Sequence, residues 1–211
     1  ISFDMGGTST DVCLIAGGRV ERSAEREVAG LPIRLPSVDI HTVGAGGGSI
    51  VWRDAGGAVR VGPESAGADP GPACYGRGGK RPAITDADLV LGKLDPDNFA
   101  GGAIKLDTAA SELAIMRDVG ERLSLNAIST AFGICEVVDE NMANAARVHA
   151  VENGKNISDN LMIAFGGAAP LHAARLCEKL GIDQCIVPQG AGVGSAIGFL
   201  KAPFGYEALA S

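Results

Sequence analysis

The sequence predicts an α/β fold with one mixed sheet, and three observations support this prediction. Two short apolar runs, residues 1–5 and 12–15, flank a glycine turn at the start of the chain, which is typical of an antiparallel hairpin. A helical periodicity extends over residues 124–154. Between residues 161 and 200 the chain alternates strand, helix, strand and helix, an order that favours an α/β sheet.

The first 30 residues are expected to form three antiparallel strands. Their turns fall at Gly6-Gly7-Thr8 and at Gly17-Gly18, and the third strand covers residues 19–28. This arrangement places a short glycine turn between the first two strands, where the backbone can approach a ligand closely.

Residues 31–84 are dense in glycine and proline, and only two short β segments, residues 50–52 and 58–61, interrupt them. Loops of this length inside a compact domain are usually functional. We therefore interpret residues 31–84 as an insertion within a single lobe that covers residues 1–211. Both ends of the chain fall inside expected elements, so we expect this lobe to be part of a longer protein.

Three helices are expected next. Thr85-Asp86-Ala87-Asp88 resembles a capping box, with Asp86 at the helix N-terminus, and Gly92 ends this short helix. The second helix covers residues 108–123, and the third extends from Ser124 or Asn126 to residue 154. The third helix has apolar positions three and four apart, which predict one buried stripe: Ile128, Phe132, Cys135, Val138, Met142, Ala145 and Val148.

The last third of the chain has the strand and helix signals of an α/β unit. Residues 161–165 are wholly apolar, which indicates a strand buried on both faces. Gly166-Gly167 follows, and Pro170 suits the first turn of a helix that Gly181 ends. A strand over residues 184–187 and a helix over residues 192–200 complete the order.

Composition excludes several classes of function. The 211 residues have a formal net charge of −7, which argues against a nucleic-acid partner because phosphate backbones need a basic surface. The five cysteines form no C-x-x-C pair, so neither a zinc knuckle nor a thioredoxin-like motif is indicated. The odd cysteine count, with no signal peptide in this sequence, fits a reducing cytoplasm, so a cytoplasmic location is expected. No apolar run approaches the roughly 20 residues of a membrane helix.

The opening hairpin carries the residue types of a phosphate site. Gly6 and Gly7 can present backbone N–H groups to phosphate, and the hydroxyls of Thr8, Ser9 and Thr10 add donors. The carboxylates of Asp4 and Asp11 are oxygen ligands of the kind that Mg²⁺ prefers. The hairpin therefore predicts a nucleotide-phosphate site with Asp4 and Asp11 as metal ligands.

Gly166-Gly167 lies at the end of a separate buried strand, where ligands of α/β sheets collect. The two glycine motifs together resemble the ribonuclease H-like lobe of the ATPase fold shared by actin, hexokinase-type kinases and heat-shock chaperones. The resemblance implies that Gly166 and Gly167 lie against the adenosine. It also implies that a missing N-terminal lobe completes the ATP clamp, so that this lobe alone is inactive.

Four further segments narrow the resemblance to the hydantoinase A/5-oxoprolinase family. These are residues 4–12 (DMGGTSTDV), 41–50 (HTVGAGGGSI), 61–76 (VGPESAGADPGPACYG) and 85–92 (TDADLVLG). Together with residues 165–167 they follow one another in the family's order across nearly the whole chain.

The resemblance implies ATP- and Mg²⁺-dependent opening of a cyclic amide such as a hydantoin or 5-oxoproline, by phosphorylation of the carbonyl oxygen. It also implies a hydantoinase B-type partner subunit or domain. Two alternatives stay open: a subunit of an acetone- or acetophenone-type carboxylase, and a non-catalytic actin- or chaperone-like ATP switch. The insertion over residues 41–74 argues against the switch.

Two residues of the insertion are candidates for catalysis. His41 precedes a glycine loop and is placed for proton transfer or substrate binding, and Glu64 is a loop carboxylate that could orient substrate. His149, near the end of its helix, is interpreted as a buried or capping residue. His172 could face the nucleotide, but a packing role is favoured because a motif position alone is weak evidence. Cys74 is interpreted as structural because no base lies near it in the sequence.

Overall fold

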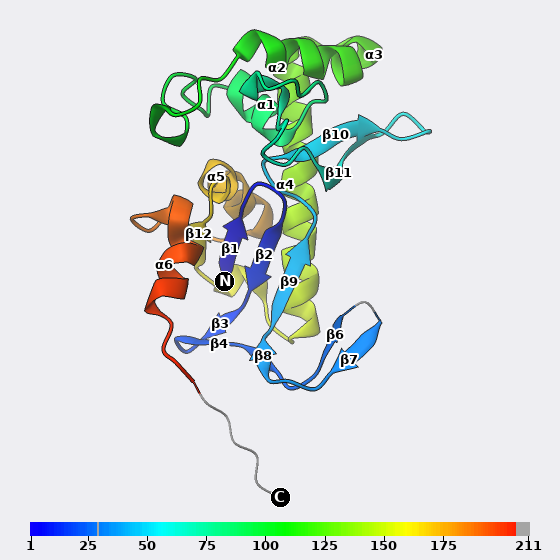
Figure 1. The fold of residues 1–211 in the computed structure, drawn as a ribbon. Helices are drawn as coiled ribbons and strands as arrows, with labels where there is room; N and C mark the ends of the chain where they lie inside the picture. The colour runs from blue at the N-terminus through cyan, green and yellow to red at the C-terminus, as the bar shows by residue number, and fades with distance from the viewer. Residues whose placement is uncertain (29, 206–211) are drawn as a thin grey trace, which may run out of the picture.

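Five strands form the central sheet of the computed structural model, which describes residues 1–28 and 30–205 (Figure 1). The strand order is β13-β12-β1-β2-β9. β1 pairs antiparallel with β2, and β2 with β9, whereas β1, β12 and β13 are parallel. The strands cover Ser2–Met5 (β1), Thr10–Cys13 (β2), Ile40–Val43 (β9), Met162–Phe165 (β12) and Cys185–Ile186 (β13). The predicted mixed α/β fold is confirmed.

The third strand of the sheet is β9, so its expected position at residues 19–28 is wrong. Those residues belong to small two-stranded ribbons instead, where Arg19 and Arg22 are exposed and Glu21 is half-buried, so their charges stay near solvent. The ribbon strands are Ile15–Ala16 (β3), Arg19–Val20 (β4), Arg22–Ser23 (β5), Arg26–Val28 (β6), Leu31–Ile33 (β7) and Ser37–Val38 (β8). β9, which falls within the expected insertion of residues 31–84, is thus a strand of the central sheet.

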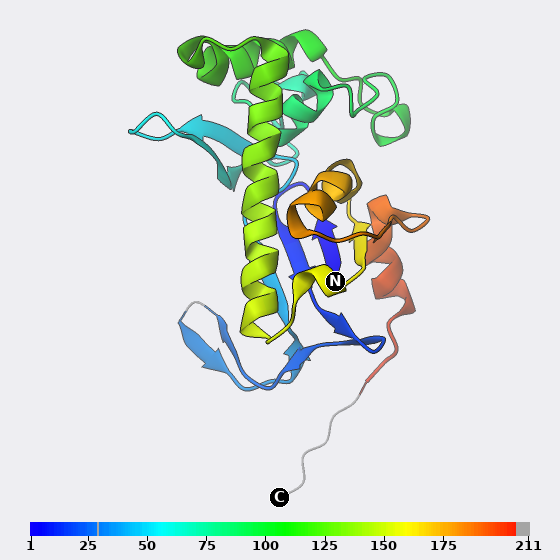
Figure 2. The same cartoon turned by 180° about the vertical axis from the view of Figure 1, so that it is seen from behind.

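Helices cover both faces of the sheet unequally. α4 (Ala127–Glu152) and α5 (Ala169–Leu180) lie on one face, as Figure 2 shows, and α6 (Gly194–Lys201) lies on the other. Asn126 caps α4, since its side chain accepts from the Ser129 N–H at 2.8 Å. None of the helices in residues 1–28 and 30–205 is long and apolar enough to cross a membrane.

A second part of the lobe, which we call the cap, lies above the sheet in Figure 1 and is formed by residues 44–126. Its hairpin consists of β10 (Ser49–Arg53) and β11 (Val59–Ser65), and its helices are α1 (Ile84–Val90), α2 (Thr108–Ile115) and α3 (Glu121–Leu123). A π-helical turn, Met116–Gly120, joins α2 to α3. The helices expected over residues 108–123 and 126–153 are therefore confirmed.

The buried stripe of α4 differs from the expected one. Ile128, Phe132 and Val148 are 57%, 56% and 47% exposed, so their assignment to the core is wrong. The buried face instead includes four alanines, which let α1 and the sheet approach the helix closely: Ala131, Ala143, Ala146 and Ala150. An apolar periodicity that counts only large side chains misses such a face.

Candidate active site

The glycine turn of the β1–β2 hairpin and the glycine loop after β9 are hydrogen-bonded to each other at the upper end of the sheet. The N–H of Gly47 donates to the Gly6 carbonyl at 3.0 Å, and the N–H of Gly48 donates to the Gly7 carbonyl at 2.6 Å. A Cβ on Gly46 would lie 2.6 Å from the backbone nitrogen of Thr8, so only glycine fits there. The cap loop and the β1–β2 hairpin therefore form one backbone junction.

A third glycine loop joins this junction from β12. Gly166 has a φ of +95°, and a Cβ there would clash with the Met5 carbonyl and lie 2.5 Å from Oδ1 of Asp4. The N–H of Ala168 donates to the Met5 carbonyl at 2.9 Å. The end of β12 and the start of α5 thus lie directly against the hairpin, so the structure brings the two predicted nucleotide motifs together.

A cavity of about 190 Å³ opens between these loops, α1 and the start of α5. Gly7 and Gly167 both line it, and a Cβ added to either residue would meet no atom within 4 Å. The remaining lining residues come from the hairpin, the cap and α5: Gly6, Gly47, Tyr75, Thr85, Asp88, Leu94, Phe99, Ala168 and Leu171. Ligand pockets usually measure about 300–1,000 Å³, so this cavity has room for part of a nucleotide.

The two predicted metal ligands are neighbours on one face of the sheet. Asp4 and Asp11 are paired in the antiparallel register of β1 and β2, and Thr42 of β9 is next in line. Oδ1 of Asp11 accepts from the Thr42 hydroxyl at 2.6 Å, and Asp4 accepts from the Ser195 hydroxyl of α6. Both aspartates are partly exposed, so a cation can reach them.

Two residues of the hairpin that are expected to contact phosphate use their polar groups inside the protein. The N–H of Gly6 donates to the Ser9 carbonyl within the turn at 3.0 Å, and is therefore already used. Thr10 is fully buried, and its hydroxyl donates to the Ala45 carbonyl at 2.6 Å. Thr10 shares the core-facing side of β2 with Val12, because residues two apart in a strand lie on the same face.

The other hairpin residues stay accessible. Gly7 and Thr8 are exposed, and Ser9 is half-buried. The Thr8 and Ser65 hydroxyls lie 3.4 Å apart, so the tip of the hairpin contacts the end of β11. Gly7, Thr8 and Ser9 are therefore the part of the hairpin that a phosphate can approach.

The two expected catalytic residues lie apart from each other. His41 is in β9, opposite Val12, and contacts the His149 ring with a centroid separation of 5.9 Å. It is not among the residues that line the nucleotide cavity. Glu64 is exposed on β11, pairs with Arg81 at 2.7 Å and lines a second cavity of about 350 Å³.

A buried charged network beneath the cavity was missed by sequence reasoning. Nδ1 of His172 lies 2.7 Å from Asp139, and Nε2 lies 3.1 Å from Asp88. All three side chains are at most 2% exposed, and Asp88 also accepts from Lys93 at 2.9 Å. Because Asp88 lines the cavity, the network forms part of its floor.

In the folded protein, the buried network contains ionised side chains. Burial alone would lower the pKa of His172, but its hydrogen bonds with Asp139 and Asp88 raise that pKa to about 9. Burial opposes ionisation of Asp88, yet the bonds from His172 and Lys93 outweigh it and hold the pKa of Asp88 below its usual value. At neutral pH His172 is thus a cation that hydrogen-bonds to Asp139 and to the Asp88 carboxylate. The sequence does contain a signal that His172 is buried. His172, Leu176 and Leu180 are four residues apart, which places His172 on the buried face of α5.

The cap residues near the junction are structural. Asp86 is fully buried and accepts from the N–H groups of Cys74 and Ala83, both at 2.8 Å. The helix N-cap is Ala83, so the expected start at Thr85 is wrong; the Thr85 hydroxyl donates to the Gly47 carbonyl instead. Burial and the nearby Asp86 carboxylate raise the pKa of the Cys74 thiol far above its usual value, which suits a packing residue.

Comparison with known proteins identifies close relatives along the chain. The hydantoinase/oxoprolinase family model matches residues 1–208. The alpha subunit of caprolactamase from Pseudomonas jessenii is 39% identical over 99% of this chain, and 5-oxoprolinase from Saccharomyces cerevisiae is 39% identical over 96%. The nucleotide-free structure of an acetone carboxylase superposes with a TM-score of 0.86 at 36% identity over 93% of this chain.

The chain spans less than a third of these relatives. It covers 30% of the caprolactamase subunit, 16% of the oxoprolinase and 28% of the acetone carboxylase chain. The structural likeness agrees with the expected lobe of the actin- and hexokinase-type ATPase fold.

Proposed function

Because this chain belongs to the hydantoinase/oxoprolinase family, we propose that it forms one ATP-binding lobe of a larger ATP-dependent enzyme that opens a cyclic amide. The observation that carries the proposal is the convergence of three glycine loops on one cavity, with open space at Gly7 and Gly167. A nucleotide can lie against backbone only where side chains are absent.

The junction suggests how each part of ATP is held. Gly167 and Ala168 provide the surface for the adenosine, and Gly7, Thr8 and Ser9 provide the donors for the phosphates. The small cavity fits one half of a clamp, and a second lobe elsewhere in the full protein closes the other side. A relative named as a subunit supports a further partner, and we propose that this partner is a hydantoinase B-type subunit or domain.

Asp4 and Asp11 fit a magnesium ion. Like charges directly opposite each other in a sheet are destabilising, and a divalent cation between these two paired carboxylates relieves that repulsion. Mg²⁺ held there would neutralise charge on the ATP phosphates. The hydroxyls of Thr42 and Ser195 keep the two carboxylates on this face of the sheet.

An amide carbonyl reacts slowly with water, so the proposed reaction begins by activating it. Transfer of the γ-phosphoryl group to the amide oxygen breaks the bond to ADP and forms an O–P bond, which makes the carbon electrophilic. Water then adds to that carbon, and the C–N bond breaks as the nitrogen takes up a proton, which leaves an acyl phosphate. A second water hydrolyses the acyl phosphate to a carboxylate and inorganic phosphate. Glu64 is proposed to face the substrate, because its cavity adjoins the hairpin through the contact of Ser65 with Thr8.

A carboxylase subunit is the second candidate, because the acetone carboxylase chain superposes with the same TM-score as the caprolactamase. ADP release by the full-length protein separates the two. Stimulation by 5-oxoproline, hydantoin or caprolactam without bicarbonate supports the amidohydrolase, whereas stimulation by acetone or acetophenone that requires bicarbonate supports the carboxylase. ATP binding without stimulation by any of these compounds would refute both.

A further inference from the structure

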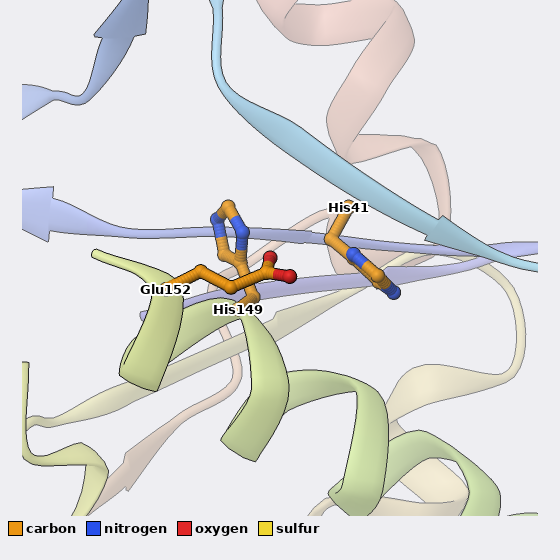
Figure 3. Close-up of side chains that lie close together, drawn as sticks. All are labelled: His41, His149 and Glu152. Carbon is orange, nitrogen blue, oxygen red and sulfur yellow. The ribbon is translucent and has the colours of Figure 1, made fainter. Parts of the chain in front are cut away.

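Three potential metal ligands gather at the end of the lobe away from the glycine junction. One ring nitrogen of His41, one of His149 and one carboxylate oxygen of Glu152 all lie within 4.8 Å of one another. Figure 3 shows His149 and Glu152 projecting from α4 toward His41 on β9. His149 and Glu152 are three residues apart on the helix, a spacing that puts both on one face.

The His149 ring has an unused polar atom inside this group. Its side chain is only 3% exposed, and Nε2 is buried with no hydrogen-bond partner. A buried polar atom without a partner costs about 1–3 kcal/mol, and such atoms are rare in folded proteins. The His149 ring therefore has a nitrogen that no group among the described residues uses.

A second carboxylate lies on the same side of the histidine. Oδ2 of Asp39 lies 4.0 Å from Nε2 of His149 and accepts from the Asn153 side chain at 3.2 Å. Asp39 therefore faces the unpartnered nitrogen of His149, and its negative charge favours a cation beside the three ligands.

We propose that His41, His149 and Glu152 bind a divalent transition-metal ion, with zinc the best match. Two imidazoles and a carboxylate, with water in a fourth position, form a familiar zinc ligand set. Zinc bonds of about 2.0–2.2 Å put neighbouring ligands roughly 3.4 Å apart. The three ligand atoms already lie within 4.8 Å of one another, and Glu152 is exposed at the end of α4, where its flexible side chain can move closer to the two imidazoles.

The site has a structural consequence. It cross-links the edge strand β9 to the last turn of α4, and β9 leads directly into the cap loop that holds the hairpin. A bound ion therefore fixes the strand from which Gly46, Gly47 and Gly48 extend. This role is independent of the proposed hydrolysis, since none of the three ligands lines the nucleotide cavity.

The test measures metal content of the full-length protein after removal of metals by a chelator and dialysis against Zn²⁺. His149→Gln and Glu152→Gln are each expected to lose one zinc ion per chain relative to wild type. Glu112→Gln, an exposed glutamate on α2, is the matched control and should retain it. Co²⁺ in place of Zn²⁺ should give a visible absorption band in the wild type that is absent in both site variants.

Thermal unfolding supplies a second measurement. Zn²⁺ should raise the midpoint of the wild type and of Glu112→Gln, and should leave Glu152→Gln unchanged. Glu152 is exposed at a helix end, so this variant is expected to fold even if His149→Gln does not. Equal zinc content in wild type and Glu152→Gln, or an equal shift of their midpoints, would overturn the proposal.

Discussion

Replacing His172 with leucine will leave Asp88 and Asp139 buried without the donor that they share. Both carboxylates are at most 2% exposed, and His172 holds each of them within 3.1 Å. Removing one partner of a buried ion pair typically costs about 3–5 kcal/mol, because the remaining charge has no compensation. We expect the variant to be destabilised by an amount in this range at pH 7.

The pKa of His172 gives an independent magnitude. A pKa raised from 6.5 to about 9 corresponds to about 3 kcal/mol, at about 1.4 kcal/mol per pH unit. Because the pKa of the folded state is the higher one, this stabilisation is fully present below pH 6.5 and is lost as pH rises through about 9. The difference between wild type and variant should therefore shrink across that window.

Two assays test this reasoning on the full-length protein. Exchange of the imidazole C2 hydrogen, followed by mass spectrometry, should place the His172 midpoint near pH 9, and urea unfolding between pH 6 and about 10 should show the shrinking difference. Arg175→Gln, which removes an exposed ion pair of the same helix, should cost less than about 1 kcal/mol at every pH. A His172 midpoint at or below 6.5, or a stability difference that does not change with pH, would refute the charged network.

Four other substitutions have distinct expected outcomes. Gly7→Val should weaken ATP binding in calorimetry by more than about tenfold, or 1.4 kcal/mol, with an unchanged melting temperature, whereas Gly133→Ala on the exposed face of α4 should leave binding intact. Asp11→Ala should abolish Mg²⁺-dependent ADP release and keep the circular dichroism spectrum of the wild type; normal turnover would exclude the metal role. Thr10→Val should cost about 1–3 kcal/mol in urea unfolding with no loss of ATP affinity, and a selective loss of affinity would return Thr10 to the phosphate site. Glu64→Gln should lower substrate-stimulated ADP release and spare ATP binding, so weaker ATP binding with normal stimulation would place Glu64 in the nucleotide site.

Local signals in the sequence predicted most elements of the fold. The wholly apolar residues 161–165, the Asn126 cap and the Gly181 end all correspond to observed boundaries. The strand expected at residues 19–28 was wrong because a segment joins a sheet only by pairing with a free strand edge, and β9 pairs with the free edge of β2. β2 pairs with β9, and the paired residues Asp11 and Thr42 are 31 positions apart in the sequence. A local sequence pattern does not reveal such a long-range pairing.

The sequence revealed the glycine motifs of the candidate site, but it did not reveal which residues contact one another there. The glycine motifs at residues 6–7 and 166–167 do meet, whereas the contact of Gly46 with Thr8 depends on a fold that closes over 38 residues. Period-two alternation from Val12 would have placed Thr10 in the core. The pairing of His172 with Asp88, 84 residues away, had no local signal, since a single aspartate in a helix is usually solvated.

α4 makes the two ends of the lobe mechanically dependent on each other. Its 26 residues run from the cap to the far edge of the sheet, and Gly133 is helical, so the rod has no hinge (Figure 2). A rod of about 39 Å that tilts by about 5° moves its far end by roughly 3 Å. A tilt of this size at the cap would move the last turn of α4, which carries His149, by a comparable distance.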